Sequence, residues 1–264
     1  MKPVDFDYAR PRTLDEAFGL LASNETAKVM AGGQTLGPML NLRFAQPELI
    51  VDITRIPELI RVDDHADTLV LGACITHAAI EDGRGPDPAR GKLARVASRI
   101  AYRAVRTRGT IGGSLAHADP AADWLTCLLA LGASVSISGA RGQRTAPLAG
   151  FIRGVMETTL GPDEILDAVV IPKLSATARW GYHKICRKTG EFADAIGAVV
   201  IDRDRARIVA GATTGRPIVI ETAASELPTD IAVHLRSAGL DADTYEMNVH
   251  TAAVRRAIEE ATAA

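Results

Sequence analysis

The sequence predicts an α+β fold, in which two α/β subdomains are followed by an antiparallel sheet that carries helices. Three observations favour this class. A strand, a glycine turn, a helix and a second strand follow one another within residues 28–53. A second glycine pair, in the segment GTIGGS at 109–114, precedes another apolar helix. The last third contains alternating, strand-like segments and then two helical ones. We expect domains at 1–55, 56–173 and 174–264.

The overall composition is that of an ordinary globular protein. The 264 residues are 47% hydrophobic and 23% charged, which is enough apolar material for a real core in one to three domains. The net charge of −2 gives no basis for binding nucleic acid or an anionic membrane. Aromatic residues make up only 4% of the chain, which argues against a base-stacking platform. We therefore expect no nucleic-acid partner.

The cysteines and the amino end bear on metals and location. Cys74, Cys127 and Cys186 are widely separated and form no CxxC pair, so we expect no zinc or iron–sulfur site in this chain. Their scatter is typical of reduced thiols in a cytosolic protein. The first residues lack the apolar core of a signal peptide, and no apolar run approaches the roughly 20 residues that span a bilayer. We expect a cytoplasmic chain without a membrane span.

The first expected helix covers 14–22, where Thr13 and Glu16 form a capping box. Strands at 28–31 and 49–53 then flank a glycine turn and a short helix at 36–42. In an α/β unit of this kind, ligands usually bind at such a turn.

The glycine turn at 32–35 leaves two interpretations open. Its segment GGQTLG lacks the G-x-G-x-x-G spacing of a dinucleotide fold, and the chain contains no GxxxxGK[ST] phosphate loop. The turn is then either a tight connection or a phosphate cradle. In the cradle, backbone N–H groups would donate together with the side chains of Gln34 and Thr35.

The next region is expected to hold strands at 60–62 and 68–71 and helices at 76–82 and 89–100. Thr76 is the expected cap of the first helix. We interpret His77 as a surface or capping histidine.

Three arginines, Arg103, Arg106 and Arg108, precede the second glycine pair. They could attract a diphosphate, contact a subunit or form a solvated face. A charge run of this kind is most often a solvated face.

The second glycine pair belongs to the segment GTIGGSLAHADPAAD at 109–123. Adjacent glycines let the backbone lie against a ligand, and consecutive N–H groups can hold an anion. The alternative is a sharp turn between a buried strand and the helix at 122–131. Asp123 either interacts with the dipole of that helix or accepts hydrogen bonds from ligand hydroxyls. Cys127 is expected in the core.

The remaining elements are strands and two final helices. Strands are expected at 134–138 and 164–171, with a turn at 139–142 and a segment at 145–153 that leads into a longer loop between them. The expected strands 179–186, 195–201 and 206–213, with a hairpin at 202–205, would form the antiparallel sheet. Helices at 230–238 and 245–261 would cover one of its faces.

Four segments in this order resemble one family. They are VMAGGQTL at 29–36, TIGGS at 110–114, PAAD at 120–123 and YHKICRKTG at 182–190. The chain is similar to the FAD-binding medium subunits of the molybdenum hydroxylases, such as bacterial carbon monoxide dehydrogenase and xanthine dehydrogenase. The resemblance covers nearly the whole chain, including the closing helix around 250–256. It implies the vanillyl-alcohol-oxidase (PCMH)-type FAD-binding fold, with FAD between the two α/β subdomains and the C-terminal subdomain completing the pocket.

The resemblance also implies a set of FAD contacts. Residues 31–35 and 110–114 match the family's two diphosphate loops, which face each other and supply N–H donors. Asp123 matches a carboxylate near the ribityl chain, Leu166 and Lys184 match positions beside the isoalloxazine, and Ile100 matches an apolar contact. The implied FAD residues are Val29, Met30, Ala31, Gly32, Gly33, Gln34, Thr35, Leu36, Ile100, Thr110, Ile111, Gly112, Gly113, Ser114, His117, Asp123, Leu166 and Lys184. No catalytic residue and no metal ligand are expected.

Some positions depart from the family pattern. The family often has histidine at Gln34 and asparagine at Ser114, and both replacements keep a hydrogen-bonding group. His117 is expected close to the flavin, but not as a base. Lys184 suits the electron-rich N1–C2=O side of a flavin, where a protein group tunes the reduction potential. The alternative is a surface lysine at a strand end.

The function that the resemblance implies is electron transfer. FAD on this chain would accept electrons from [2Fe-2S] clusters on a small partner subunit and pass them to an external acceptor. Substrate would be oxidised at the molybdopterin cofactor of a large subunit, in a dimer of heterotrimers. A self-contained FAD-dependent oxidase or reductase of the same fold is the alternative. A non-catalytic nucleotide-binding module is a third possibility.

Overall fold

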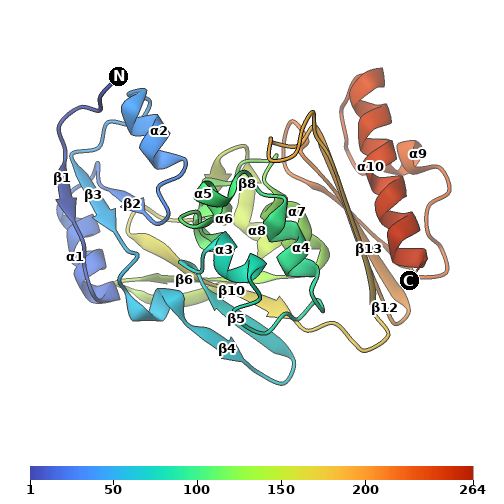
Figure 1. Ribbon diagram of the computed structural model, residues 1–264, viewed down its shortest axis with the longest axis horizontal. Helices are drawn as coiled ribbons and strands as arrows, with labels where there is room; N and C mark the ends of the chain where they lie inside the picture. The colour runs from blue at the N-terminus through green and yellow to red at the C-terminus, as the bar shows by residue number, and fades with distance from the viewer. Residues whose placement is uncertain (264) are drawn as a thin grey trace.

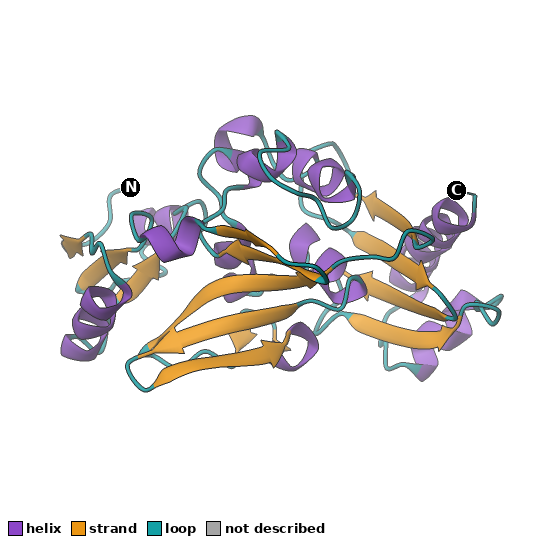
Figure 2. Ribbon diagram, turned by 90° about the horizontal axis from the view of Figure 1, so that it is seen from below, coloured by secondary structure: helices purple, strands orange, loops and turns teal. Residues whose placement is uncertain are grey.

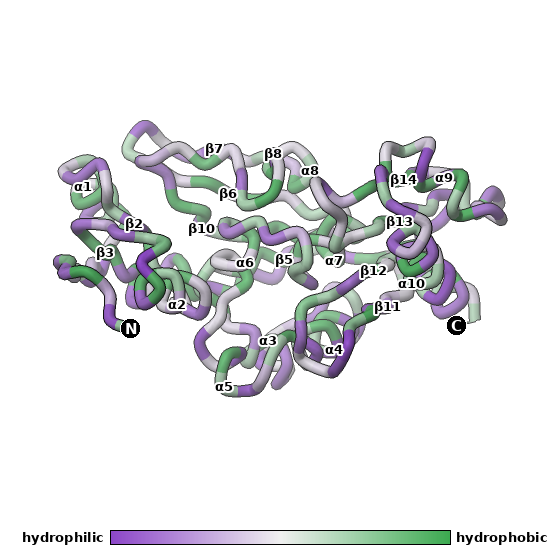
Figure 3. The backbone as a smooth tube through the Cα atoms, turned by 90° about the horizontal axis from the view of Figure 1, so that it is seen from above, coloured by the Kyte–Doolittle hydropathy of each residue, from purple (hydrophilic) through white to green (hydrophobic). Residues whose placement is uncertain are grey.

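The computed structural model describes residues 1–263, so the last residue of the third expected domain lies outside the described part. Three main sheets of three, five and four strands follow one another along an elongated molecule. The two chain termini lie at opposite ends (Figures 1 and 3). Helices lie on both sides of the strands (Figure 2). Among the described residues, no helix combines the length and the apolar character that a membrane crossing requires.

The first sheet is parallel and carries the first glycine turn. Its elements are β1 (Asp7–Ala9), α1 (Leu14–Ser23), β2 (Lys28–Met30), α2 (Leu36–Asn41) and β3 (Leu49–Asp52). The strand order is β1-β3-β2, and α1 packs Phe18 and Leu21 against one face. Thr13 caps α1 by accepting a hydrogen bond from the Glu16 amide. The predicted helices and strands of this part are confirmed to within one residue.

The second sheet is antiparallel, in the order β4-β5-β10-β6-β7. The expected strand at 60–62 is wrong, because Pro57–Ile60 form a short 3-10 helix and the strand begins at Val62. Proline suits the start of a helix, where its missing N–H is not needed. The segment 145–153, expected to lead into a loop, instead contains the end of a strand at Pro147, a helical turn and the start of another strand. The elements are β4 (Val62–Asp64), β5 (Thr68–Gly72), β6 (Ser134–Gly139), β7 (Gly142–Pro147), α8 (Leu148–Phe151), β8 (Ile152–Gly154), β9 (Glu157–Thr158) and β10 (Glu164–Pro172).

Helices from the middle of the chain cover one face of this sheet and form the largest apolar core. They are α3 (His77–Glu81), α4 (Lys92–Ser98), α5 (Arg103–Arg106), α6 (Ile111–His117) and α7 (Asp123–Ala130). The helix expected over 89–100 begins only at Lys92, because Arg90 and Gly91 have left-handed backbones, with φ of 56° and 84°. Helix α7 is buried along its whole length, and Cys127 lies in the core as predicted.

The second glycine pair does not form the expected turn. Gly112 and Gly113 lie in the first turn of α6, and the Thr110 side chain caps the helix by accepting a hydrogen bond from the Gly113 amide at 3.0 Å. Helix α6 ends at His117, and the next residue, Ala118, has a left-handed backbone. The segment therefore presents a helix start to the first sheet.

The third sheet is antiparallel, with four strands in chain order. Its elements are β11 (Arg179–Ile185), β12 (Ala195–Asp202), β13 (Arg205–Gly211), β14 (Ile218–Ala223), α9 (Ile231–Ser237) and α10 (Thr244–Thr262). The predicted hairpin and both helices are confirmed, whereas β14 was not predicted. Helices α9 and α10 cover one face, and α7 covers the other, so Ala198 of β12 packs toward α7 and Val199 toward α10. Helix α7 therefore joins the second and third sheets.

Candidate functional site

The structure brings the two glycine segments together. A Cβ atom placed on Gly32 would lie 2.7 Å from the Cα of Gly109 and would overlap the carbonyl oxygen of Arg108. A Cβ atom on Gly113 would lie 3.6 Å from the Cβ of Ala31. Because real side-chain carbons do not approach as closely as the first of these distances, the contact requires glycine at position 32. Segments separated by about eighty residues thus form one surface.

The first glycine turn carries a row of free backbone donors. Within residues 1–263, no hydrogen bond pairs the N–H groups of Gly32, Gly33, Gln34 and Thr35. Gly33 has a left-handed backbone, with φ of +69°. The side-chain amide of Gln34 donates from Nε2 to the Gly32 carbonyl at 3.1 Å. The row lies at the carboxyl end of β2 and the start of α2. Successive free N–H groups in such a place suit an anion.

The amides of α6 differ from this row, because all four at its start are paired inside the protein. The expectation that both glycine segments supply free N–H donors is therefore wrong for the second segment. Its glycines instead allow a close backbone approach. The pairs are Ile111 N with Ile75 O at 3.0 Å, Gly112 N with Ala73 O at 2.9 Å, Gly113 N with Thr110 Oγ1 at 3.0 Å and Ser114 N with Thr110 O at 3.0 Å.

A buried charged cluster is formed by Asp123, Tyr182 and Lys184. Asp123 is the first residue of α7, and the two other residues are two positions apart on β11, so their side chains share one face of the strand. The Lys184 ammonium lies 3.0 Å from Oδ2 of Asp123, and the Tyr182 hydroxyl donates to Oδ1. The side chains of the lysine and the aspartate are 2% and 5% exposed. The interpretation of Lys184 as a surface lysine is therefore wrong.

The electrostatics of this cluster follow from its burial. Desolvation raises the pKa of Asp123 above its ordinary value, and the positive charge of Lys184 and the Tyr182 hydrogen bond act in the opposite direction. Burial and the Asp123 charge raise the pKa of Tyr182 well above its ordinary value, so its hydroxyl stays a donor. The Lys184 ammonium has three N–H donors and, within residues 1–263, one hydrogen-bond acceptor. Two donors thus remain for another acceptor.

The other implied FAD residues lie around these two places. Leu166 is buried in β10, and Ile100 is half-buried just after α4; both pack with the core that contains Ile111 and Tyr182. His117 is half-buried at the end of α6, and the Ser114 side chain makes no hydrogen bond within the described chain. The implied residues therefore come from all three sheets or from the helices beside them.

His77 supports the second glycine segment, and the interpretation of it as a surface or capping residue is wrong. It is buried, and its Nδ1 accepts a hydrogen bond from Nε1 of Trp124 at 2.9 Å. Its backbone amide donates to the Gly109 carbonyl at 2.9 Å. Burial, with a smaller effect of Arg106, lowers the pKa of His77 to about 4.

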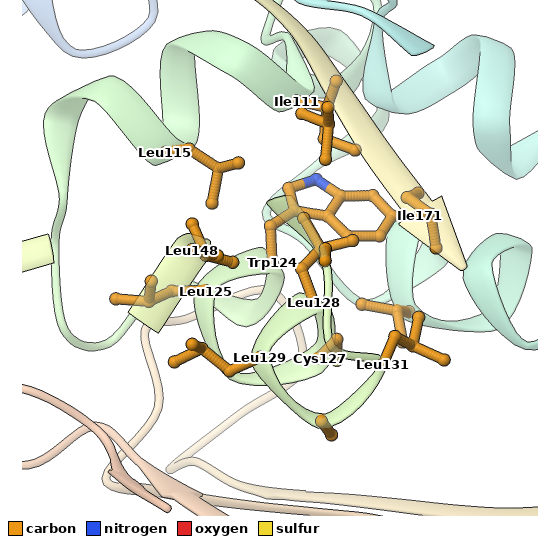
Figure 4. Close-up of a cluster of buried hydrophobic side chains, with 14 of the residues drawn as sticks. Ile111, Leu115, Trp124, Leu125, Cys127, Leu128, Leu129, Leu131, Leu148 and Ile171 are labelled. Carbon is orange, nitrogen blue, oxygen red and sulfur yellow. The ribbon is translucent and has the colours of Figure 1, made fainter. Parts of the chain in front are cut away.

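The sequence contained one signal for this contact. A buried tryptophan usually donates its indole N–H to an acceptor, and the helix around Trp124 supplies none. Figure 4 shows Trp124 among apolar side chains that include Ile111 and Leu128. An acceptor from another element was therefore to be expected, and His77 is that residue.

The arginines before α6 are mostly occupied. Arg103 forms ion pairs with Glu81 and Asp82, and Arg106 pairs with Glu81 and also donates to the carbonyls of residues 100 and 101. These contacts join α5 to the end of α3. Arg108 is exposed and forms no ion pair in the described part of the chain. The cluster thus serves mainly to fix α5.

Comparison with a protein-family model gives a match over residues 4–174, to a family described as the FAD binding domain in molybdopterin dehydrogenase. Two relatives match over most of their length. The nicotine 6-hydroxylase medium subunit of Paenarthrobacter nicotinovorans is 33% identical over 100% of this chain and 99% of its own. The carbon monoxide dehydrogenase medium chain of Hydrogenophaga pseudoflava is 39% identical over 76% of this chain and 70% of its own.

Solved structures of two oxidoreductases have the same fold as this chain. The carbon monoxide dehydrogenase structure from Hydrogenophaga pseudoflava matches with a TM-score of 0.88 and 32% identity, over 100% of this chain and 99% of the matched chain. Quinoline 2-oxidoreductase from Pseudomonas putida 86 matches with a TM-score of 0.86 and 29% identity, with the same coverage. The whole fold, including the antiparallel third sheet, is thus found in these oxidoreductases.

Proposed function

Because the chain belongs to the FAD-binding medium subunits of the molybdenum hydroxylases, we propose that it carries electrons through FAD. In this proposal a small partner subunit with [2Fe-2S] clusters delivers the electrons, and an external acceptor receives them. A large subunit with the molybdopterin cofactor oxidises the substrate. The chain is an oxidoreductase subunit, and the bound FAD supplies the redox chemistry, while the residues of the chain bind and orient it.

The main support for FAD binding is the set of backbone N–H groups in the first glycine turn that are unpaired in the described chain. The diphosphate of FAD bears about two negative charges, and the N–H groups of residues 32–35 are the donors that it would engage. The α6 segment would contribute contact surface through Gly113 and the hydroxyl of Ser114. Arg108, beside this surface and without an ion pair in residues 1–263, would add a positive field.

The buried cluster fits the flavin end of the cofactor. Lys184 has spare N–H donors for the N1–C2=O side of the flavin, and Asp123 has carboxylate oxygens for ribityl hydroxyls. In FAD these two groups are neighbouring parts of one molecule. The 3.0 Å separation between the ammonium and the carboxylate is therefore consistent with both residues serving one cofactor.

The partners follow from the relatives. The relatives named above are a medium subunit and a medium chain, which indicates assemblies of several different chains. We extend this to a dimer of heterotrimers in the cytoplasm. The domain limits 1–55, 56–173 and 174–264 are part of the same proposal, because each range contains one main sheet.

Isolation of the native assembly tests this function. The expected result is copurification of a small iron–sulfur subunit and a large molybdenum subunit, with FAD on this chain that becomes reduced when substrate is added. Selective removal of FAD should stop electron delivery to the acceptor while substrate still reduces the iron–sulfur clusters. If the isolated chain with FAD oxidised a substrate at full rate without partners, it would be a self-contained flavoenzyme and the proposal would be wrong.

A further inference from the structure

Tyr182 is a member of the buried cluster that the family resemblance did not imply. Its ring is buried, and its hydroxyl donates to Oδ1 of Asp123, the carboxylate oxygen that Lys184 does not contact. The two β11 residues thus share one carboxylate, each through its own oxygen. Among residues 1–263, the tyrosine hydroxyl is the one side chain that donates to Oδ1.

The backbone of Tyr182 is fixed by an ion cluster between domains. Its amide donates to Oε2 of Glu260 on α10 at 3.2 Å. Glu260 also forms ion pairs with Lys92 and Arg95 on α4. The position of the tyrosine is therefore set by three elements, β11, α10 and α4, which hold its hydroxyl against Asp123.

We propose that Tyr182 is a positioning residue that sets how much positive charge Lys184 presents to the flavin. This inference rests on the proposed function. The phenol hydroxyl satisfies one oxygen of Asp123, so the carboxylate depends less on Lys184 for its stabilisation. Lys184 then keeps its remaining donors for the cofactor. Without the hydroxyl, Asp123 would draw on the lysine alone and would compete with the flavin for it.

The physical reason lies in the low dielectric of a buried site. A hydrogen bond to a charged group is stronger there than in water, and an unpaired carboxylate oxygen is costly. The reduced flavin is more negative than the oxidised form on its N1 side, so it gains more from Lys184. A loss of available positive charge must therefore weaken the binding of the reduced form more than that of the oxidised form.

The test compares FAD in the intact assembly carrying Tyr182→Phe with wild type. Phenylalanine keeps the ring and removes only the hydroxyl. We expect normal FAD content and a more negative flavin midpoint potential, equivalent to a fall of about tenfold in the ratio of reduced to oxidised affinity. The matched control is Tyr245→Phe, because Tyr245 is an exposed tyrosine on α10 and should leave the potential unchanged.

A second variant makes the test independent of how well Tyr182→Phe folds. Asp123→Asn removes the negative charge beside Lys184, so it should make the potential more positive. In the Asp123→Asn background, Tyr182→Phe should have no further effect, because there is no carboxylate left to stabilise. An unchanged potential in Tyr182→Phe with normal FAD content, or in Asp123→Asn, would overturn the inference. Absence of FAD from the wild-type chain would instead refute the proposed function.

Discussion

The buried histidine beside the second glycine segment leads to a quantitative prediction. His77 must be neutral to accept the hydrogen bond from Trp124, and burial lowers its pKa from 6.5 to about 4. In the unfolded chain the histidine takes up a proton as the pH falls below 6.5, whereas in the folded chain it does not. The unfolded state therefore gains protons first, and the stability of the fold decreases between pH 6.5 and 4.

The magnitude follows from the size of the shift. At about 1.4 kcal/mol for each pH unit, a pKa displaced from 6.5 to about 4 corresponds to about 3 kcal/mol of unfolding free energy. The stability is undiminished above pH 6.5, and the loss of about 3 kcal/mol is complete near pH 4. It is large compared with the usual 5–15 kcal/mol of a domain, so roughly a third of a typical stability is involved.

The assay is urea unfolding of the purified chain at a series of pH values, followed by tryptophan fluorescence. The comparison variant is His77→Gln, whose amide oxygen can accept from Trp124 but does not titrate. Carboxylates affect both proteins alike, so the difference between the two curves isolates the histidine. Wild type should lose about 3 kcal/mol more than the variant between pH 7 and pH 4. Parallel curves would refute the reasoning.

Two further predictions concern the packing of the third sheet. Lys184→Met should lower the unfolding free energy by about 3–5 kcal/mol, because it leaves Asp123 buried without its counter-charge. Adding Asp123→Asn should restore much of this unfolding free energy, as measured by chemical denaturation. A double variant as unstable as Lys184→Met would contradict the role of the ion pair. Gly197→Ala should lower the stability by about 1–3 kcal/mol, since its Cβ would lie 2.6 Å from the carbonyl carbon of Ala253 on α10. Gly150→Ala, where nothing lies within 4 Å of the new carbon, is the control in thermal unfolding, and equal melting temperatures would argue against close packing of α10.

Local patterns predicted most of the elements because each pattern lies within one segment. The Thr13 cap and the hairpin at 202–205 are of this kind. The start of α6 shows where such reasoning stops. Glycine pairs have low helix propensity, so the sequence around Gly112 and Gly113 favours a turn. In the structure, Gly112 is held against Ala73 by backbone contact, and this tertiary packing overrides the propensity.

The site itself was predicted as a set of residues but not as an arrangement. Both glycine segments, Asp123 and Lys184 are recognisable in the sequence, whereas the distance between them is not. The ion pair joins residues 61 positions apart, and no local pattern indicates it. The pairing of the α6 amides was likewise hidden, because their acceptors Ala73 and Ile75 lie in another part of the chain.

The central claim is that the first glycine turn binds the diphosphate of FAD. The most direct measurement is the flavin-to-protein ratio of the purified chain by absorbance, for wild type, Gly32→Ala and Gly37→Ala. The first substitution displaces the turn from residues 108 and 109, whereas a Cβ on Gly37 would have no atom within 4 Å. We predict about one FAD per chain for wild type and for Gly37→Ala, and little or none for folded Gly32→Ala. Full flavin content in Gly32→Ala would contradict the account.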